Sequence, residues 1–283
     1  MKIDKRSVEL VVISDIHLGT YGCHSEDLLR YLKTIKPKKL VLNGDIIDIW
    51  QFSKRYWPNS HMQIIKHITG LLSSGTKVIY LPGNHDEMLR KFVGFKLGNF
   101  QIENKVLLTL QGKKTWIFHG DVFDITMQYS KWLAKLGAVG YDTLILLNTF
   151  ANFLLRSVGK GKISLSKKIK DSVKSAVKFI ADFENTAAEL AVDNKYHNVI
   201  CGHNHHPQIR EIKNEKGSVT YLNSGDWVEN LTALEYDNGQ WELYRFAEDP
   251  VAQSVTVNKK ARKELNTDDI FKDMVAEFLT VKT

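Results

Sequence analysis

The sequence predicts an α/β protein with two mixed β-sheets packed face to face and helices on the outside. Three observations support this fold class. Short apolar runs rich in β-branched residues recur at strand length, and several of them end in a cluster of polar residues. The first three runs alternate with segments of helical periodicity, which is typical of parallel β-α-β units. The later runs follow one another across turn signals, as in β-hairpins.

Three strands alternate with two helices in the first third of the chain. The strands are expected at VELVVIS (8–14), KKLVLN (38–43) and TKVIYL (76–81). Two helices are expected between them, because apolar residues recur there at helical spacing. The residues that share these two helical faces are Leu28, Leu29, Leu32 and Ile35, followed by Ile64, Ile65, Ile68, Leu71 and Leu72.

Hairpin signals dominate the other strand-forming segments. KVLLTL (105–110), the turn QGKK and TWIFHGD (115–121) predict one hairpin. Further strands are expected within 197–207, 206–212, 218–226, 231–236 and 240–246, with Asn238-Gly239 as a turn. We expect the two halves of the chain to form the two sheets.

A helical segment separates the two groups of strands. Residues from about 125 to about 194 lack proline and have helical patterning, so we expect a helical cap inserted into a domain of residues 1–248. Residues 249–283 form a polar tail, with one short helix expected around Asp268 to Phe278. We assign this tail no chemistry.

Composition narrows the class of protein further. With 283 residues, 43% of them hydrophobic, the chain can bury a substantial core. Cys23 and Cys201 are too few for a disulfide framework, and we expect Cys201 to be a buried apolar residue rather than a nucleophile. The start of the chain shows no signal-peptide pattern. The longest apolar stretch, Leu144 to Leu155, is interrupted by polar residues and shorter than the roughly 20 residues that span a bilayer. We therefore expect a cytoplasmic protein.

Five of the expected strands share a polar cluster directly after the apolar run. These clusters, SDIHLG, NGDIID, PGNHD, FHGD and CGHNHHP, each contain Asp, Asn or His. Loops at the carboxyl ends of strands converge in open α/β sheets, so we expect these side chains to meet. Histidine with carboxylate suits divalent transition metals, and two such ions need about seven or eight donors. The sequence therefore predicts a metal site rather than five solvated loops.

Some histidines carry a different expectation. His206 lies directly after GHNH in the last cluster, and we expect it to orient a neighbour or to face solvent. The others are expected to be ordinary helix or loop residues, namely His24, His61, His67 and His197.

The ordered motifs DIH, GDIID, GNHD, HGD and GHNH resemble those of the calcineurin-like metallophosphoesterase superfamily, over residues 8 to about 228. This resemblance implies a four-layer α/β/β/α sandwich that carries two metal ions. Carried over by position, the implied ligands of one ion are Asp15, His17, Asp45 and His205. Those of the other ion are Asp45, Asn84, His119 and His203, so that Asp45 is shared. His85 would contact the phosphoryl group and assist the leaving group, and Asp48 would orient His85.

The implied chemistry is hydrolysis of a phosphoester or pyrophosphate. Two cations about 4 Å apart can bind phosphoryl oxygens, activate a bridging water and stabilise the charge on the attacking and leaving oxygens. We expect the ions to be Mn²⁺, with Mg²⁺, Zn²⁺ or Fe as alternatives. Glycines in the motifs are expected to allow the tight turns that bring the ligands inward, at Gly44, Gly83, Gly120 and Gly202.

The insertion bears on the substrate. Its apolar stretch is followed by a basic segment that contains a single acid, Asp171, and the formal net charge of the whole chain is +7. The basic residues are Arg156, Lys160, Lys162, Lys167, Lys168, Lys170, Lys174 and Lys178. This composition is expected of a contact with an anionic membrane or of an acyl-chain groove. The alternative is an amphipathic cap with a solvated basic face.

More narrowly, the chain resembles the UDP-2,3-diacylglucosamine pyrophosphatase family, which acts in lipid A synthesis on the cytoplasmic face of the inner membrane. The insertion, the segment NSGDWVE (223–229) and HGDVFD agree with this family. The resemblance implies substrate contacts at Asn84, Asp124, Lys174 and Lys178, and a peripheral membrane location.

The substrate stays open on one point. The best-known members of that family have arginine after the motif asparagine, whereas this chain has His85. A soluble phosphodiesterase or phosphomonoesterase that acts on nucleotides or small phosphoesters is therefore the alternative. A scaffold without turnover is a third hypothesis, which the complete set of motif residues disfavours. We expect no nucleic-acid partner.

Overall fold

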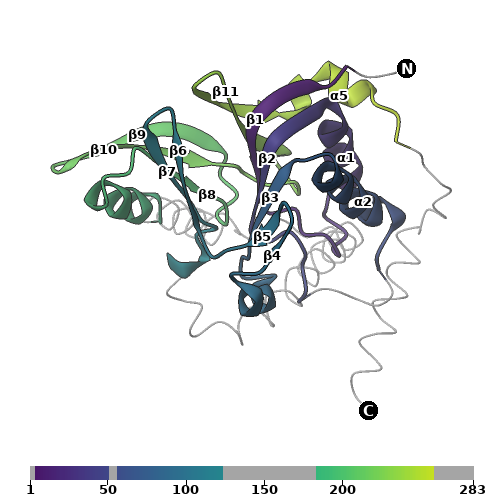
Figure 1. Ribbon diagram of the computed structural model, residues 1–283, viewed down its shortest axis with the longest axis horizontal. Helices are drawn as coiled ribbons and strands as arrows, with labels where there is room; N and C mark the ends of the chain where they lie inside the picture. Colours follow the sequence, from purple (N-terminus) through teal and green to yellow (C-terminus); the bar gives the residue numbers. More distant parts are fainter. Residues whose placement is uncertain (1–3, 51–55, 124–182, 258–283) are drawn as a thin grey trace, which may run out of the picture.

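The computed structural model describes residues 4–50, 56–123 and 183–257, and two β-sheets form its centre (Figure 1). The first sheet has seven strands in the order β12-β11-β1-β2-β3-β5-β4. The second sheet has five strands in the order β6-β7-β8-β10-β9. Both sheets contain parallel and antiparallel pairs, as the sequence predicts.

The N-terminal part forms the parallel centre of the first sheet. Its elements are β1 (Arg6–Ile13), α1 (Ser25–Thr34), β2 (Ile35–Asn43), α2 (Asn59–Ser73) and β3 (Lys77–Leu81). After β3 the chain forms η1 (Glu87–Phe92), β4 (Lys96–Leu97) and β5 (Phe100–Ile102) at one edge. β1, β2 and β3 run parallel, so their carboxyl ends lie at the same edge of the sheet.

The later strands complete both sheets. The second sheet is built from β6 (Val106–Leu110), β7 (Lys113–Ile117), β8 (Asn198–Cys201), β9 (Gln208–Asn214) and β10 (Gly217–Asn223). A short helical turn, η2 (Asp121–Phe123), follows β7. The chain then forms β11 (Thr232–Asp237), β12 (Gln240–Arg245), η3 (Phe246–Glu248) and α5 (Pro250–Ser254).

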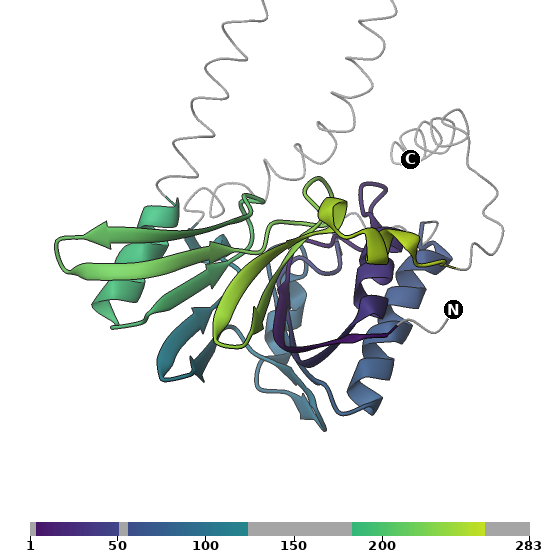
Figure 2. The ribbon, with the colours of Figure 1, turned by 90° about the horizontal axis from the view of Figure 1, so that it is seen from above.

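Three apolar clusters separate four layers, which confirms the predicted sandwich. On β1, Val11 and Ile13 face α1 and α2, whereas Leu10 and Val12 face the second sheet. This alternation is the period of two that a strand buried on both faces requires. The third cluster lies between the second sheet and a helical segment, residues 183–193. Figure 2 shows α1 and α2 on one side of the first sheet and the second sheet on the other.

Cys201 is buried, and Cys23 is half-buried. Cys201 is buried in β8, as the sequence predicts, and burial raises the pKa of its thiol well above the ordinary value. Burial also raises the pKa of Cys23 to about 12. A thiol needs a lowered pKa to act as a nucleophile at neutral pH, so neither side chain is suited to that role.

Two expectations about the fold were wrong. The two halves of the chain do not correspond to the two sheets, because β11 pairs with β1 and carries the last hairpin back to the first sheet. Ile35 begins β2 rather than continuing the preceding helix, which ends at Thr34. Pro37 disfavours helical geometry at Lys36, so the helix has to end before that residue.

Short elements were also missed. β4 and β5 are too brief for a period to be visible, and α5 begins where Asp249 caps the backbone N–H of Ala252. The helix expected around 268–278 and most of the expected insertion lie outside the described residues. None of the helices in the described ranges is long and apolar enough to cross a membrane.

Candidate metal centre

Five loops meet at the carboxyl ends of β1, β2, β3, β7 and β8. The backbone continues the strand pairing into these loops, since Asp15 N donates to Gly44 O at 3.0 Å and His17 N donates to Asp45 O at 2.9 Å. Gly202 N donates to His119 O at 2.9 Å, which links the loops after β7 and β8 in the same way. The sheet geometry therefore fixes where the motif side chains emerge.

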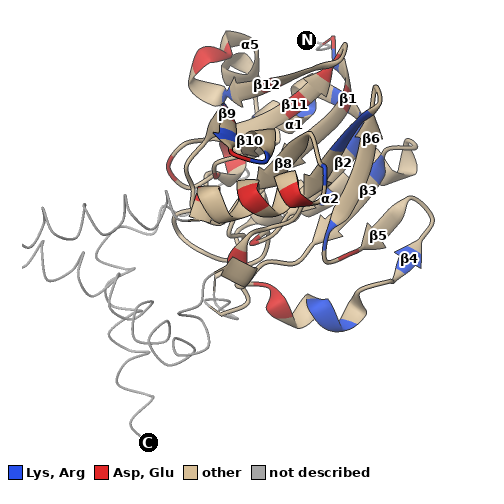
Figure 3. Ribbon diagram, turned by 90° about the vertical axis from the view of Figure 1, so that its left-hand side faces the viewer, with Lys and Arg blue, Asp and Glu red and all other residues tan. Residues whose placement is uncertain are grey.

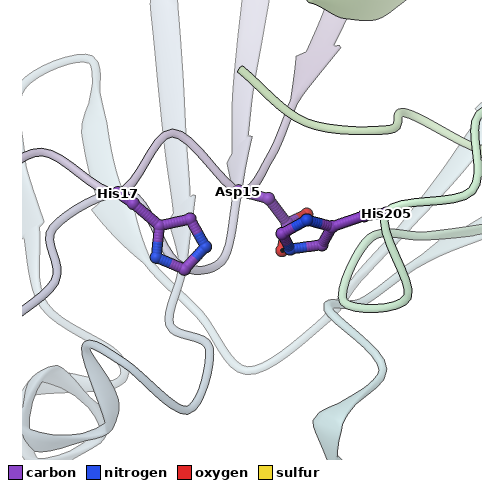
Figure 4. A group of neighbouring side chains, drawn as sticks. All are labelled: Asp15, His17 and His205. Atoms are coloured by element: carbon purple, nitrogen blue, oxygen red, sulfur yellow. Dashed lines mark ion pairs between the residues drawn. The ribbon is translucent and has the colours of Figure 1, made fainter. Parts of the chain in front are cut away.

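The first group consists of Asp15, His17 and His205. One ligand-type atom from each residue lies within 4.8 Å of the other two. In Figure 4 the His205 ring overlaps the Asp15 carboxylate, and the His17 ring lies to one side of them. His205 Nε2 lies 3.2 Å from Asp15 Oδ1, and Asp15 is fully buried. These three residues are a carboxylate and two imidazoles from loops 190 positions apart.

The second group consists of Asp45, His119 and His203, again within 4.8 Å of one another. Asp45 Oδ2 lies 3.3 Å from His119 Nε2. His119 Nδ1 lies 2.8 Å from the carbonyl oxygen of Asn43, which can only accept a hydrogen bond. Nδ1 therefore carries a hydrogen, and in the neutral ring Nε2 is free to bind a cation.

A third group joins His17, Asp48 and His85. His85 Nδ1 lies 2.8 Å from Asp48 Oδ2, and His17 Nδ1 lies 3.4 Å from the same oxygen. The side chain of Asp48 is 1% exposed, whereas that of His85 is 24% exposed. A buried carboxylate thus holds one nitrogen of a histidine ring that reaches the surface of the site.

The backbone at these positions is unusual. Five of the seven predicted ligands have left-handed φ angles, which are 52° at Asp15, 54° at His17, 54° at Asp45, 65° at His203 and 53° at His205. Such angles are uncommon outside glycine and concentrate at functional sites, where the surrounding structure sustains the strain.

Two glycines lie directly behind side chains of predicted ligands. A Cβ at Gly44, where φ is +82°, would lie 2.1 Å from His119 Nδ1. A Cβ at Gly83 would lie 2.2 Å from Asp45 Oδ1. Gly44 therefore serves both the turn and the close approach, whereas Gly83 serves the approach alone.

Several buried polar atoms at the site form no hydrogen bond to the described residues, although Asp15 Oδ1 lies 3.2 Å from His205 Nε2 and His119 Nε2 lies 3.3 Å from Asp45 Oδ2. They are Asp15 Oδ1, His17 Nε2, Asn84 Oδ1 and His119 Nε2. Buried polar atoms of this kind are normally paired. All four are carbonyl or carboxylate oxygens or imidazole nitrogens, which are the atom types that bind divalent transition metals. The site therefore fits divalent metal ions.

The buried acids and histidines of the site shift one another's pKa. Burial opposes the ionised form of Asp45, but the neighbouring His119, followed by His85 and His17, outweighs it and holds the pKa of this carboxyl well below its usual range. Burial likewise opposes protonation of His119, and the Asp45 carboxylate raises the pKa of the ring above its ordinary value. A bound cation would take the place of the proton between them.

The histidines outside these groups make other contacts. His206 lies 3.2 Å from the buried Glu184 carboxylate, and its backbone N–H binds Asn204. His61 Nδ1 accepts from Gly19 N, and His67 Nε2 contacts Leu32 O. His24 lies beside Asp27, and His197 accepts from Lys114 N. None of these five belongs to the three groups found in the described part of the chain.

One acid that braces the site was missed from the sequence. Asp86, the last residue of GNHD, accepts hydrogen bonds from Ile46 N at 2.9 Å, Gly83 N at 2.6 Å and the Tyr80 hydroxyl. It thereby ties the loop after β2 to the loop after β3. Its place at the end of the motif was its signal in the sequence.

A second acid, Asp121 of HGD, forms an ion pair with Arg90 of η1. The basic end of η1 is blue in Figure 3. This contact joins the loop after β3 to the loop after β7. The remaining expected substrate contacts, Asp124, Lys174 and Lys178, lie outside the described residues.

Two face-to-face mixed sheets, with histidine and carboxylate groups where their strands end, are the arrangement that the sequence predicts for a metal-dependent phosphoesterase. The profile of the calcineurin-like phosphoesterase family matches residues 8–207. The chain belongs to this family, and it is a metal-dependent phosphoesterase or pyrophosphatase.

Several relatives are named UDP-2,3-diacylglucosamine hydrolase. The one from Aliivibrio fischeri (strain MJ11) is 23% identical over 241 residues, 83% of this chain and 98% of that protein. The one from Stenotrophomonas maltophilia (strain K279a) is 24% identical over 242 residues, 82% of this chain and 96% of that protein. The one from Blochmanniella pennsylvanica (strain BPEN) is 26% identical over 224 residues, 75% of this chain and 85% of that protein.

Proposed function

We propose that the chain is a dinuclear metal hydrolase that cleaves the pyrophosphate of a UDP-2,3-diacylglucosamine-like lipid in lipid A synthesis. The two-metal part rests on one observation, the buried unpaired donor atoms in two adjacent His/Asp groups. The substrate rests on the relatives of that name, which match along most of their length.

The proposed ligands follow the two groups. Asp15, His17 and His205 hold one ion, and Asn84, His119 and His203 hold the other, with Asp45 shared between them. When bound, the two ions supply Lewis acidity toward the phosphoryl oxygens and an activated water. Nitrogen and oxygen donors suit Mn²⁺, which we propose as the working metal.

His85 is the proposed proton donor to the leaving oxygen. Asp48 holds its Nδ1 at 2.8 Å, so the ring is oriented and Nε2 is left for the substrate. Burial opposes protonation of the ring, but the contact with Asp48 and the charge of Asp45 raise its pKa above the ordinary value, which keeps a proton available. Asn84, as a ligand beside His85, is the proposed contact to the phosphoryl group. Asp124, Lys174 and Lys178 are proposed to contact the rest of the substrate.

The location follows from the substrate. A diacylated substrate resides in a membrane, so we propose that the protein acts at the cytoplasmic face and binds anionic lipid peripherally. Flotation with phosphatidylglycerol vesicles, weakened by added salt, is the expected result.

A soluble phosphodiesterase or phosphomonoesterase is the second candidate. His85 favours it, because this chain lacks the arginine of the best-known pyrophosphatases at that position. A histidine can transfer a proton to a leaving group, whereas an arginine stays protonated and only donates hydrogen bonds to an anionic group.

A substrate panel separates the two candidates. The manganese-loaded protein is assayed with UDP-2,3-diacylglucosamine, bis-p-nitrophenyl phosphate and p-nitrophenyl phosphate. The lipid pyrophosphate is expected to have the highest kcat/KM. Faster hydrolysis of either p-nitrophenyl ester would favour the soluble phosphoesterase.

A further inference from the structure

The loop of residues 223–230, NSGDWVEN, has no part in the proposed chemistry, yet it contacts the ligand-bearing loop after β1. The hydroxyls of Ser14 and Ser224 lie 2.7 Å apart, and Ser14 Oγ donates to Gly225 O at 2.9 Å. Trp227 N donates to the carbonyl oxygen of Asp15 at 3.1 Å. The Ser14 side chain and the Asp15 carbonyl are therefore held by this loop.

The same loop contacts the ligand-bearing loop after β8. Asn230 Nδ2 donates to the carbonyl oxygen of His205 at 3.0 Å. The carboxylate of Asp226 lies on the side of the His205 ring away from Asp15, with Oδ2 3.9 Å from Nδ1. His205 Nε2 faces Asp15 at 3.2 Å. The ring thus lies between two buried carboxylates.

Asp226 is the centre of the loop. This side chain is fully buried, and its Oδ1 accepts from Val228 N at 2.8 Å, from Asn230 N at 3.2 Å and from Glu229 N. Its Oδ2 accepts from the side-chain amide of Asn230. A carboxylate with this many N–H donors is held in one orientation.

We propose that Asp226 is a positioning residue for the first metal, acting through the loop on Asp15 and through its charge on His205. The proposal rests on the two-metal part of the proposed function. A histidine that binds a metal commonly presents its other nitrogen to a carboxylate, which fixes the ring. Asp15 and His205 both have left-handed φ angles, 52° and 53°, and such geometry persists only when its surroundings hold it.

The contacts of Asp226 and Asn230 fall on one half of the site, where both meet His205. Asn223, at the start of the loop, instead binds Gly202 O and Asn204 Oδ1 on either side of His203 in the second group. In that group Asn43 O also binds His119, and Asp86 holds the loops around Asp45. Loss of the Asp226 charge is therefore expected to weaken the binding of one ion more than that of the other.

The test is manganese binding to the full-length, metal-free chain, measured by titration calorimetry with a two-site fit. Asp226→Asn keeps the size of the side chain but places an amide against Asn230 Nδ2 and His205. The expected result is ~10–100-fold weaker binding at one site, with the other within about threefold of the parent. Glu229→Gln, an exposed neighbour in the same loop, removes the same charge and is expected to match the parent.

Two further measurements separate positioning from folding. Asn230→Ala, at an exposed position, is expected to weaken the same site. The thermal midpoint of each metal-free variant reports whether that variant is folded. In Asp226→Asn and Asn230→Ala, the spin-coupled electron paramagnetic resonance signal of two manganese ions should be absent at Mn²⁺ concentrations that produce it in the parent.

Unchanged affinity at both sites in Asp226→Asn and Asn230→Ala would overturn the proposal. An equal loss at both sites would also overturn it, because the role would then be structural. A parent chain that binds fewer than two ions would overturn the two-metal function itself, which distinguishes the two failures.

Discussion

Gly44→Ala places a methyl group against a proposed metal ligand. The added Cβ would lie 2.1 Å from His119 Nδ1 and 2.2 Å from Cγ, whereas ordinary contact begins at 3.4 Å. The ring must therefore move by about 1.3 Å, or the backbone must move with it. A misplacement of about 1 Å in a catalytic group can cost roughly 10²-fold in rate. We expect Gly44→Ala to lower both manganese affinity and kcat by about this factor.

The matched control is Gly112→Ala. Gly112 has φ +79°, close to the +82° of Gly44, but no atom lies within 4 Å of its added Cβ. Gly112→Ala should lose about 1–2 kcal/mol of unfolding free energy from backbone strain, seen by denaturant titration of the metal-free protein. Gly44→Ala should lose more than this, because its methyl group also overlaps the His119 ring. Only Gly44→Ala should lose manganese binding and turnover. Parent-like binding and rate in Gly44→Ala would refute the close-approach argument.

Three further predictions concern the ligands, the proton donor and the protons that the ions displace. Asp45→Ala should abolish two-ion binding and activity with the fold preserved, whereas His206→Ala should have a mild effect. Metal analysis together with activity assays tests both variants. Two bound ions and full turnover in Asp45→Ala would contradict the ligand assignment. His85→Ala should keep its metal and lose about 10²–10⁴-fold in kcat, with part of the loss recovered by a good leaving group. Equal damage with good and poor leaving groups would mean that His85 only binds phosphate. Burial opposes protonation of both rings, but Asp45 raises the pKa of His119 to about 10 and Asp15 raises the pKa of His205 to about 9. Both histidines therefore carry a proton at pH 8 that manganese must displace, so manganese should release protons and bind more tightly as the pH rises toward 9. Binding heats that do not change between two buffers of different ionisation enthalpy would exclude this release.

The parallel centre of the fold was predictable because its signals are local. β1, β2 and β3 are apolar runs of strand length, and the order of strand and helix fixes their parallel pairing. The motif residues could be found for the same reason, since each follows a strand directly. The return of β11 to β1 could not be predicted, because a hairpin carries no mark of the sheet that it joins.

The supports of the site were hidden for a physical reason. Asp86 and Asp226 act through hydrogen bonds to backbone groups of their own or other loops, which no residue type announces. The left-handed φ angles at Asp15 and Asp45 depend on the loops around them rather than on the residues themselves. Only the assembled sheets show that these ordinary residues hold an unusual geometry.

The central claim is that two ions held by one shared carboxylate carry out the hydrolysis. The most direct measurement is a titration of metal-free protein with Mn²⁺ in which bound ions per chain and turnover of UDP-2,3-diacylglucosamine are followed together. We predict that activity appears with the second ion and saturates at two ions per chain. Full activity at one ion per chain, or two bound ions without turnover of this lipid, would contradict it.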